Sequence, residues 1–340
     1  MDALTTTGLT KAYGRASGRV RLPGRGSTGL VRALEDLSIS VKSGEIFGFL
    51  GPNGAGKSTT IRLLLGFIHP SAGGGTVLGL DIVRDSVAIR SRVGYLPGGI
   101  ALYDSLSGER LLDYLGELTG RPSVRRAELV DRLELSSRTL ARPVRDYSRG
   151  MRQKMGIIQA LQHDPELAIL DEPTEGLDPL MQRSFYAILD DLKAAGRTIF
   201  FSSHVLSEVE RVCDRVAIVR HGRLVALQDV ASLLEHRKRN VELRAADGDL
   251  PALEGIAGVS GIGRSADGRL TCQLEGDVGP FLAAIAGHRI TDLTIEPAHL
   301  EEAFLELYED AATDIAEDAD PADGGAAAGA GSTRSAGGAR

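Results

Sequence analysis

The chain has 340 residues, a formal net charge of −7, 42% hydrophobic residues and 25% charged residues. This is the composition of an ordinary globular protein with room for one large or two modest domains, and the charge gives no reason to expect nucleic acid or lipid as a partner. Cys213 and Cys272 form no Cys-x-x-Cys pair, so we expect buried free thiols in a reducing compartment rather than disulfides or a zinc site. The first residues lack the features of a signal peptide and no stretch is long enough to span a membrane, so we predict a chain that is soluble by itself.

The N-terminal part of the chain predicts a sheet that leads into a glycine-rich loop. Residues 4–13 and 33–41 predict strands. The segment 15–31 between them is rich in Gly, Arg and Ser. We interpret it as a solvated loop, with contact to lipid headgroups or to a partner as the alternative. Residues 45–50 form a short apolar run, typical of a buried strand, and the helix predicted from residue 59 has one apolar face.

Residues 51–58 read Gly-Pro-Asn-Gly-Ala-Gly-Lys-Ser, a pattern typical of a phosphate-binding loop at a strand-to-helix turn. The glycines permit the torsions that turn successive N–H groups inward, and the positive end of the helix faces the same anion. We expect Lys57 to reach the β- and γ-phosphates and the Ser58 hydroxyl to bind Mg²⁺. A glycine-rich turn that only happens to precede a lysine is the alternative, and the flanking strand and helix argue against it. The residues expected to bind nucleotide here are Gly51, Pro52, Asn53, Gly54, Ala55, Gly56, Lys57, Ser58 and Thr59.

The middle of the chain alternates predicted helices and short apolar strands. Residues 71–75 predict a turn, 75–80 and 93–97 short strands, and 105–140 mainly helices. A further helix follows Tyr147-Ser148-Arg149-Gly150-Met151 and ends at Asp164-Pro165. The apolar strand 167–170 ends at two carboxylates, Asp171 and Glu172. The remaining predicted elements are a helix at 180–195, a strand at 198–202 that stops just before His204, a strand at 215–219 and a hairpin turn at 220–223.

From about residue 240 the pattern changes. Residues 241–243, 261–264, 270–274 and 290–295 predict strands, and residues 250–256, 278–287 and 299–309 predict helices. This order, β-α-β-β-α-β, predicts a small ferredoxin-like α+β domain over residues 240–309. Residues 311–340 are mostly Ala, Gly and Asp without periodicity, which predicts a disordered tail.

Over residues 4–235 these motifs resemble the nucleotide-binding subunit of an ABC transporter. The loop at 51–58 matches the first phosphate motif of that family, and residues 147–151 stand where its signature, Leu-Ser-Gly-Gly-Gln, would lie. Residues 167–172 match the second acidic motif, 176–178 the loop that follows it, and His204 the switch histidine. Five motifs in the right order make the resemblance specific. It implies an α/β fold of the P-loop NTPase class, with an ATPase domain over residues 1–235, a mixed sheet at its core and a helical subdomain at about 98–150.

The residue types at the end of the apolar strand suit ATP hydrolysis. Asp171 can hold Mg²⁺ through water together with Ser58, and Glu172 points the other way from the strand and can polarise the attacking water. A solvated strand end is the alternative, but the carboxyl edge of an α/β sheet is where such folds bind ligands. His204 follows another strand at the same edge, where it can hydrogen-bond the γ-phosphate. We therefore assign catalysis to Glu172, His204 and Lys57.

Further roles are implied by the resemblance alone. Tyr13 is expected to stack on the adenine ring. Ser148 and Gly150 are expected to contact the γ-phosphate bound by a second copy, so that ATP lies between two chains, although Ser148 also fits a plain helix N-cap. Asp178 is assigned to the nucleotide site because it belongs to the loop after the acidic motif.

Two departures from the family pattern affect the prediction. Arg149 and Met151 replace a Gly and the Gln of the signature, a variant frequent in drug- and antibiotic-exporter relatives. Gly98 stands where the family usually carries a Gln that links Mg²⁺ and water to the membrane partner, so we expect slow hydrolysis or a substitute group. The segment after Gly98, including Tyr103 and Leu106, lies where a coupling helix of the membrane subunit normally docks.

The predicted function is that of an ATPase subunit that forms a dimer around ATP and drives a separate membrane permease from the cytoplasmic face of the membrane. The resemblance favours export of a drug, antibiotic or lipid-like compound and leaves the substrate itself open. The alternative is an ABC ATPase that acts on a ribosome or another macromolecule. A P-loop kinase or GTPase is a third interpretation, and the lack of an Asn-Lys-x-Asp motif argues against it.

Overall fold

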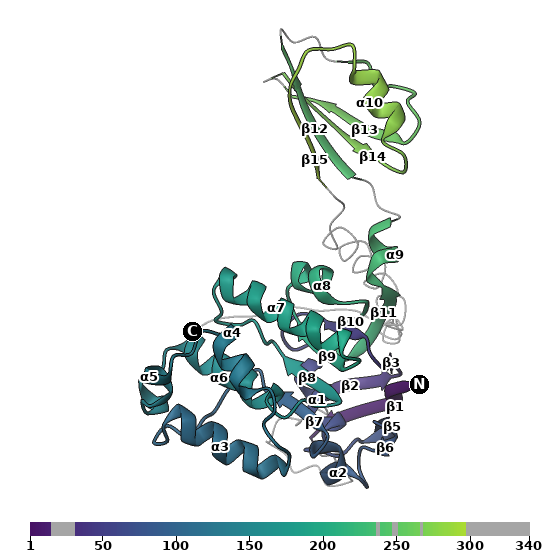
Figure 1. Ribbon diagram of the computed structural model, residues 1–340. Coiled ribbons are helices and arrows are strands. Elements are labelled where there is room, and N and C mark those ends of the chain that lie inside the picture. The colour runs from purple at the N-terminus through teal and green to yellow at the C-terminus, as the bar shows by residue number, and fades with distance from the viewer. Residues whose placement is uncertain (15–30, 236–238, 247–250, 266–267, 297–340) are drawn as a thin grey trace, which may run out of the picture.

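The computed structural model describes residues 1–14, 31–235, 239–246, 251–265 and 268–296. The predicted loop at 15–31 falls outside this part of the chain except for Val31, and the predicted helix at 299–309 and the predicted tail at 311–340 fall outside it entirely. Over the described residues the strands form three sheets, two in the N-terminal part and one in the C-terminal part (Figure 1).

The central sheet is mixed, as predicted, and has the strand order β11-β10-β4-β9-β8-β7. Strands β4, β8 and β9 are buried along their whole length, which explains their almost unbroken apolar sequences. Neighbouring strands are parallel except at β10 and β11, which form the hairpin predicted at residues 220–223. The bounds are β4 Ile46–Leu50, β7 Val93–Leu96, β8 Leu167–Asp171, β9 Thr198–Ser203, β10 Arg215–Arg220 and β11 Arg223–Asp229.

The two faces of the central sheet bury different hydrophobic cores, because successive residues of a strand point to opposite sides. Phe47 and Phe49 of β4 pack with Phe200 of β9 and with helix α1, and the ring centroids lie 5.8 and 5.2 Å from that of Phe200. Ile46 and Leu50 face the other core, which is shared with the remaining large helices. These helices are α3 Gly108–Thr119, α4 Arg126–Arg132, α6 Arg149–Leu161, α7 Pro179–Ala194 and α8 Leu206–Val212; α1 spans Lys57–Leu64.

The helical subdomain predicted at about 98–150 is present as α3, α4, a short α5 at Ser137–Leu140 and a 3₁₀ turn at Val144–Asp146. Leu111 and Leu112 of α3 are buried, whereas Leu118 is 65% exposed. Leu129 of α4 is buried in the same core. Leu118, near the C-terminal end of α3, therefore does not join that core.

The second sheet is antiparallel, with the order β2-β1-β5-β6 and with β3 paired to β1. The prediction of a turn at residues 71–75 was wrong, because β5 already begins at Ala72. Gly74 and Gly75 pair in register with Thr7 and Thr6 of β1, so backbone hydrogen bonds make a strand from residues that read as a turn. The bounds are β1 Asp2–Tyr13, β2 Val31–Leu37, β3 Ser40–Lys42, β5 Ala72–Val77 and β6 Leu80–Asp81, and the short helix α2 spans Ser86–Arg90.

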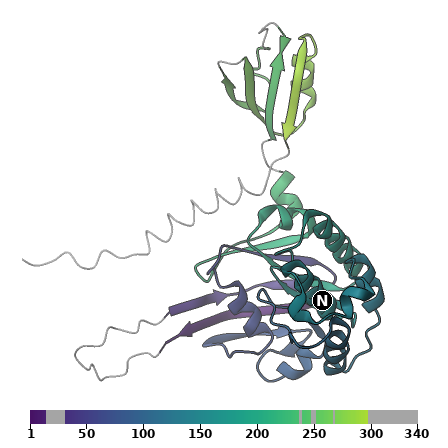
Figure 2. The same cartoon turned by 90° about the vertical axis from the view of Figure 1, so that its left-hand side faces the viewer.

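The C-terminal part contains an antiparallel sheet of order β13-β14-β12-β15, with α10 packed on one face through Phe281 and Ile285. Both views show it standing apart from the other two sheets (Figures 1 and 2). The helix predicted at 250–256 was wrong for the described residues: 251–256 are not helical, and Leu253 is instead buried in the core beneath α10. The bounds are α9 Val230–Glu235, β12 Arg239–Ala245, β13 Val259–Arg264, β14 Arg269–Leu274, α10 Gly279–Ile285 and β15 Ile290–Glu296.

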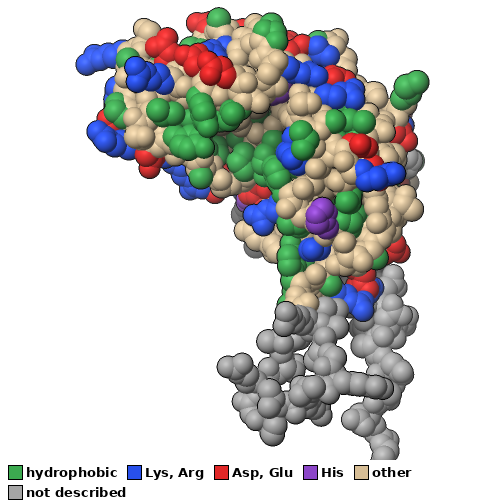
Figure 3. Space-filling model, turned by 90° about the horizontal axis from the view of Figure 1, so that it is seen from below, with side chains coloured by type: hydrophobic (Ala, Val, Ile, Leu, Met, Phe, Trp, Pro, Cys, Tyr) green, Lys and Arg blue, Asp and Glu red, His purple; other side chains and the backbone are tan. Residues whose placement is uncertain are grey.

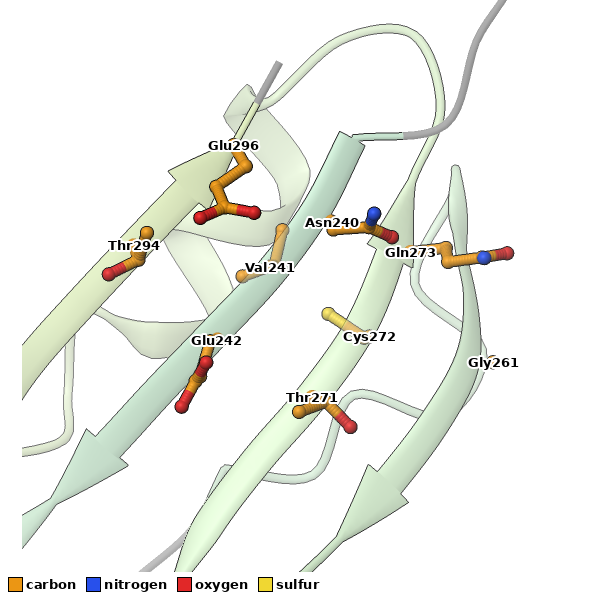
Figure 4. A pocket seen from close by; sticks show the side chains of 9 residues that line it. All are labelled: Asn240, Val241, Glu242, Gly261, Thr271, Cys272, Gln273, Thr294 and Glu296. Atoms are coloured by element: carbon orange, nitrogen blue, oxygen red, sulfur yellow. The ribbon is translucent and has the colours of Figure 1, made fainter. Parts of the chain in front are cut away.

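The face of this sheet opposite α10 is polar. It carries a shallow cavity of about 330 Å³, and Figure 4 shows its lining side chains on neighbouring strands. Glu242 of β12 lies in register with Thr271 on one side and with Thr294 on the other. Alternation of apolar residues beneath α10 with polar residues opposite is what a sheet with one covered face requires.

Both cysteines are buried free thiols, as predicted. Burial raises the pKa of the Cys213 thiol well above its ordinary value and raises the pKa of Cys272 as well. Among the described residues, no helix is long and apolar enough to cross a membrane.

Candidate functional site

The loop at residues 51–58 connects β4 to α1 at the carboxyl edge of the central sheet. Gly56 caps the helix with a φ of +107°, which strains any residue with a side chain. A Cβ atom placed on Gly51 would lie 2.4 Å from the carbonyl oxygen of Val219 in β10. The fold thus requires glycine at both positions before any ligand is considered.

Lys57 lies across the loop that precedes it. Its side chain is 5% exposed, and its Nζ donates hydrogen bonds to the carbonyl oxygens of Gly51, at 2.6 Å, and Pro52, at 3.3 Å. The same ammonium lies 3.3 Å from Oε1 of Glu172. A cavity of about 170 Å³ opens beside it, lined by Ala33, Pro52, Asn53, Gly54, Gly56, Lys57, Ser58, Thr59 and Glu172.

Asp171 is buried at the end of β8, with 3% of its surface exposed. Oδ2 accepts a hydrogen bond of 2.8 Å from the Ser58 hydroxyl, and Oδ1 accepts one of 2.5 Å from the Ser202 hydroxyl. A carboxylate beside a hydroxyl at the start of a phosphate loop is a set of oxygen ligands that suits Mg²⁺, directly or through water. The residues present therefore fit the predicted metal.

The side chains of Asp171 and Glu172 contact different partners, and Glu172 lies just beyond the end of β8. The Glu172 side chain turns toward the phosphate loop, where Oε1 meets Lys57, and its Oε2 lies 2.9 Å from Nδ1 of His204. Glu172 has a φ of +50°, and its backbone N–H donates to the carbonyl oxygen of Ser202, at 3.1 Å. The three predicted catalytic residues, Lys57, Glu172 and His204, are thus brought together.

Ser148 and Gly150 lie elsewhere. The Ser148 hydroxyl caps α6 by accepting a hydrogen bond of 3.3 Å from the N–H of Met151. Arg149 forms an ion pair with Glu175, and a Cβ atom on Gly150 would lie 2.9 Å from the carbonyl oxygen of Gly176. Among the described residues that line the phosphate-loop cavity, neither Ser148 nor Gly150 is present.

Asp178 and Tyr13 are among the other predicted residues that do not line that cavity. Asp178 is the N-cap of α7, where its Oδ1 accepts hydrogen bonds from the N–H groups of Leu180 and Met181, at 3.1 and 3.0 Å. Tyr13 is 41% exposed at the end of β1, and the Lys11 ammonium lies 5.2 Å from the centroid of its ring. Its exposed ring is available for stacking, and within one chain its contact is with Lys11.

Gly98 lies against the metal-binding candidate. A Cβ atom placed on it would be 3.2 Å from Oδ2 of Asp171. A side chain at this position would therefore lie beside Asp171. Because residue 98 is a glycine in this chain, no side chain contacts Asp171 from this position.

Sequence reasoning missed three polar residues behind the site: Ser202, Thr174 and Glu208. Ser202 pairs in register with Asp171, so its hydroxyl reaches the carboxylate across the two strands. Glu208 is 8% exposed and accepts hydrogen bonds from Thr174 and Ser203. The two serines that end the apolar strand Thr198–Ser203 were the available signal, because polar side chains there need partners.

A large apolar groove lies on the face seen from below, between α2 and α3, where hydrophobic side chains gather around a hollow (Figure 3). Its volume is about 630 Å³, and Ile100, Ala101 and Leu102, just after Gly98, form part of its wall. Tyr103 is 55% exposed and contacts Tyr114 edge to face, whereas Leu106 packs against the core. Other lining residues are Phe67, Val87, Tyr95, Leu115 and Leu118.

Comparison with known proteins identifies the family. Residues 34–175 match the family model described as ABC transporter. The chain is 40% identical over 282 residues to an uncharacterized ABC transporter ATP-binding protein of a Nostoc species, which covers 81% of this chain and 83% of the relative. It is 32% identical to the daunorubicin resistance ATP-binding protein DrrA3 of Streptomyces coeruleorubidus, over 91% of this chain and 96% of that protein.

Another relative is the Nod factor export ATP-binding protein I of Ralstonia nicotianae, 32% identical over 89% of this chain and 93% of that protein. A solved ATP-binding subunit of an ABC transporter superposes with a TM-score of 0.59 at 30% identity, covering 68% of this chain and 91% of that chain. The chain therefore belongs to the ABC transporter family. Within it the chain is an ATP-binding subunit and an ATPase, which confirms the predicted class and enzyme activity.

Proposed function

We propose that this subunit forms a dimer around two ATP molecules and drives a separate membrane permease that exports its substrate. The observation that carries the proposal is that the predicted site residues lie in two separate places on one chain. Lys57 and Glu172 line the phosphate-loop cavity, and Asp171 is joined to that loop through the Ser58 hydroxyl. Ser148 and Gly150 lie at a helix start outside that cavity. A second copy, related by a twofold axis, would bring its own helix start to the phosphates.

Each residue at the loop has a proposed task. Lys57 exchanges its carbonyl partners for β- and γ-phosphate oxygens, which also releases Glu172 from its ammonium. Ser58 and Asp171 hold Mg²⁺, which supplies positive charge that offsets the phosphates. Glu172 then accepts a proton from the attacking water, and His204, in contact with Glu172, donates a hydrogen bond to the γ-phosphate.

The remaining residues complete the proposed sandwich. Tyr13 offers an exposed aromatic face for adenine. Ser148 can keep its capping role while its own hydroxyl hydrogen points to a phosphate oxygen of the partner's ATP. Asp178, which caps α7 in the loop after Glu172, orders that loop at the interface.

The apolar groove supports a membrane partner. Its wall includes the segment after Gly98 and two exposed residues, Phe67 and Val87, that are 50% and 73% exposed. A hollow of about 630 Å³ lined mainly by apolar side chains suits an amphipathic helix from a permease. Such docking would hold the subunit at the cytoplasmic face of the membrane.

Export is favoured by the relatives whose names describe it, among them the daunorubicin resistance protein and the Nod factor export protein. Both match about nine tenths of this chain, including its C-terminal part. The strand order β13-β14-β12-β15 is that of a ferredoxin-like sheet. This order supports the small ferredoxin-like accessory domain predicted after residue 240. Co-purification with ribosomes rather than with membranes would contradict a permease partner.

The substitution Glu172→Gln tests the central claim. It keeps the size of the side chain and removes the proton acceptor, so we expect ATP turnover to fall about 100-fold or more while ATP binding persists. The variant should elute as a dimer with ATP and as a monomer with ADP in size-exclusion chromatography with light scattering. Glu117→Gln, an exposed change on α3, is the matched control. Turnover at the wild-type rate would refute the role assigned to Glu172.

A further inference from the structure

A buried carboxylate lies behind the loops that carry Glu172 and His204. It belongs to Glu208 in α8, which is 8% exposed. Its Oε1 accepts a hydrogen bond of 2.5 Å from the Thr174 hydroxyl, and its Oε2 accepts one of 2.6 Å from the Ser203 hydroxyl. Both oxygens are therefore used, one by the loop after β8 and the other by the end of β9.

The two hydroxyls belong to the segments that position the proposed catalytic pair. Thr174 follows Glu172 by two residues, and Ser203 directly precedes His204. The Ser203 oxygen also accepts the N–H of Val205, at 2.9 Å, so its hydrogen bonds extend to both sides of His204. Through these bonds Glu208 ties the end of β9 to the loop after β8.

The burial of Glu208 disfavours the ionised form of its carboxylate. Within the described residues it forms no ion pair with Lys, Arg or His. Its negative charge adds to burial in raising the pKa of Tyr186 on α7. Burial of a carboxylate without a cation opposes folding unless hydrogen bonds compensate, and a hydrophobic side chain would fill the same volume without that penalty. The two hydrogen bonds that it accepts, from Thr174 and from Ser203, explain why a polar side chain is present there.

We propose that Glu208 is a positioning residue for ATP hydrolysis: it fixes the separation of Glu172 and His204 by holding the Thr174 and Ser203 hydroxyls. The contact that it protects is the 2.9 Å approach of His204 Nδ1 to Glu172 Oε2. The inference rests on the proposed roles of Glu172 and His204. Glu208 does not line the phosphate-loop cavity; it shares a neighbouring cavity of about 220 Å³ with Glu172 and His204, and both of its oxygens there accept hydrogen bonds from Thr174 and Ser203.

Replacement of Glu208 separates this role from a general structural one. Glu208→Ala removes both acceptors and should lower kcat about tenfold or more, because small displacements of catalytic groups are costly. KM for ATP should stay within about twofold, since the phosphate loop is held by other elements. Glu208→Gln keeps the shape and one carbonyl oxygen, so we expect it to restore a large part of kcat. Ser207→Ala, an exposed change on the same helix, is the control.

The single hydroxyl variants Ser203→Ala and Thr174→Val test the route of the effect. Each should lower kcat on its own. Thr174→Val should not lower it further in the Glu208→Ala background, because that bond is already lost, whereas Ser203→Ala also removes the bond from the Val205 N–H. Losses that multiply in the Thr174→Val, Glu208→Ala double variant would overturn the proposal, as would an equal change of KM and kcat. If Glu208→Ala does not fold, the two single variants and Glu208→Gln decide the question alone, and unchanged kcat in all three overturns it.

Failure of this inference is distinct from failure of the proposed function. If Glu172→Gln abolishes turnover while Glu208→Ala leaves kcat unchanged, Glu172 keeps its role and Glu208 loses the one proposed here. If Glu172→Gln hydrolyses ATP at the wild-type rate, the catalytic assignment fails first.

Discussion

The phosphate-loop end of the proposed site and its signature end differ in how much of their geometry one chain fixes. At the loop end Lys57 and Asp171 are 5% and 3% exposed, and their polar atoms already have partners. At the signature end the Arg149 side chain is 71% exposed, and the Ser148 hydroxyl accepts only a long hydrogen bond of 3.3 Å from its own helix.

This difference indicates that the two ends act at different steps. A buried, hydrogen-bonded cluster is organised before nucleotide arrives, and preorganisation of this kind favours tight binding by the single chain. In the proposed dimer, the exposed helix start gains its partners only when a second chain approaches. Changes at the loop end should therefore affect ATP binding by one subunit, and changes at the signature end should affect only the dimer.

The largest expected effect is that of Lys57→Ala at the loop end. The change removes the buried ammonium that we expect to contact the β- and γ-phosphates, so turnover should fall about 100-fold or more. Binding of a fluorescent ATP analogue by the monomer should weaken in parallel. Lys42→Ala, an exposed change on β3, should alter neither. Normal nucleotide affinity in the Lys57→Ala variant would refute the claim that the phosphate-loop end binds ATP within one chain.

Ser148→Ala tests the signature end and should have a smaller effect. The lost hydrogen bond to a charged phosphate should weaken the ATP-dependent dimer of the Glu172→Gln protein about tenfold for each site. ATP affinity of the monomer should not change. Analytical ultracentrifugation over a range of protein concentrations measures the first quantity, and nucleotide titration of the wild-type background measures the second.

The loss of a helix cap must be separated from the loss of a phosphate contact. Ser136 caps α5 in the same way as Ser148 caps α6, since its side chain accepts a hydrogen bond of 3.1 Å from the N–H of Thr139. Ser136→Ala therefore removes an equivalent cap at a place with no expected role in the dimer. Equal weakening of the dimer by the two variants would show that Ser148 acts only through its helix.

The sequence predicted the loop end well because its geometry is local. The spacing of Gly51, Gly56 and Lys57 specifies a turn with its own torsions, and Asp171 and Glu172 stand together at the end of an apolar run. Glu172 lies beyond β8 with a φ of +50°, so the strand period does not by itself set the direction of its side chain. The same reasoning did not find Ser202, whose contact with Asp171 depends on which strand lies beside β8 and in which register. Non-local pairing of this kind leaves no trace in the spacing of residues along the chain.

The errors in secondary structure have a similar cause. Residues 72–75 read as a turn by composition, yet pairing with β1 makes them a strand. Residues 250–256 read as a helix, yet the φ of +83° at Gly255 suits an irregular segment, and that segment still buries Leu253. In both places tertiary packing overrides local propensity. The position of Glu208 could not be predicted for the same reason, because its two partners come from different loops.

The smallest expected effect concerns the ion pair between Arg149 and Glu175, which joins the signature helix to the loop after Glu172. Exposed ion pairs contribute about 0–1 kcal/mol, so Arg149→Ala should change turnover less than about fivefold and thermal stability only slightly. If the pair orients the signature end, Glu175→Ala should have the same effect, and the two changes together should add nothing. The charge-reversed pair Arg149→Glu with Glu175→Arg should then recover activity lost in either single reversal. If Arg149→Ala lowered turnover as much as Lys57→Ala, the signature end would already be organised within one chain. That result would contradict the conclusion drawn above from the exposure of the Arg149 side chain.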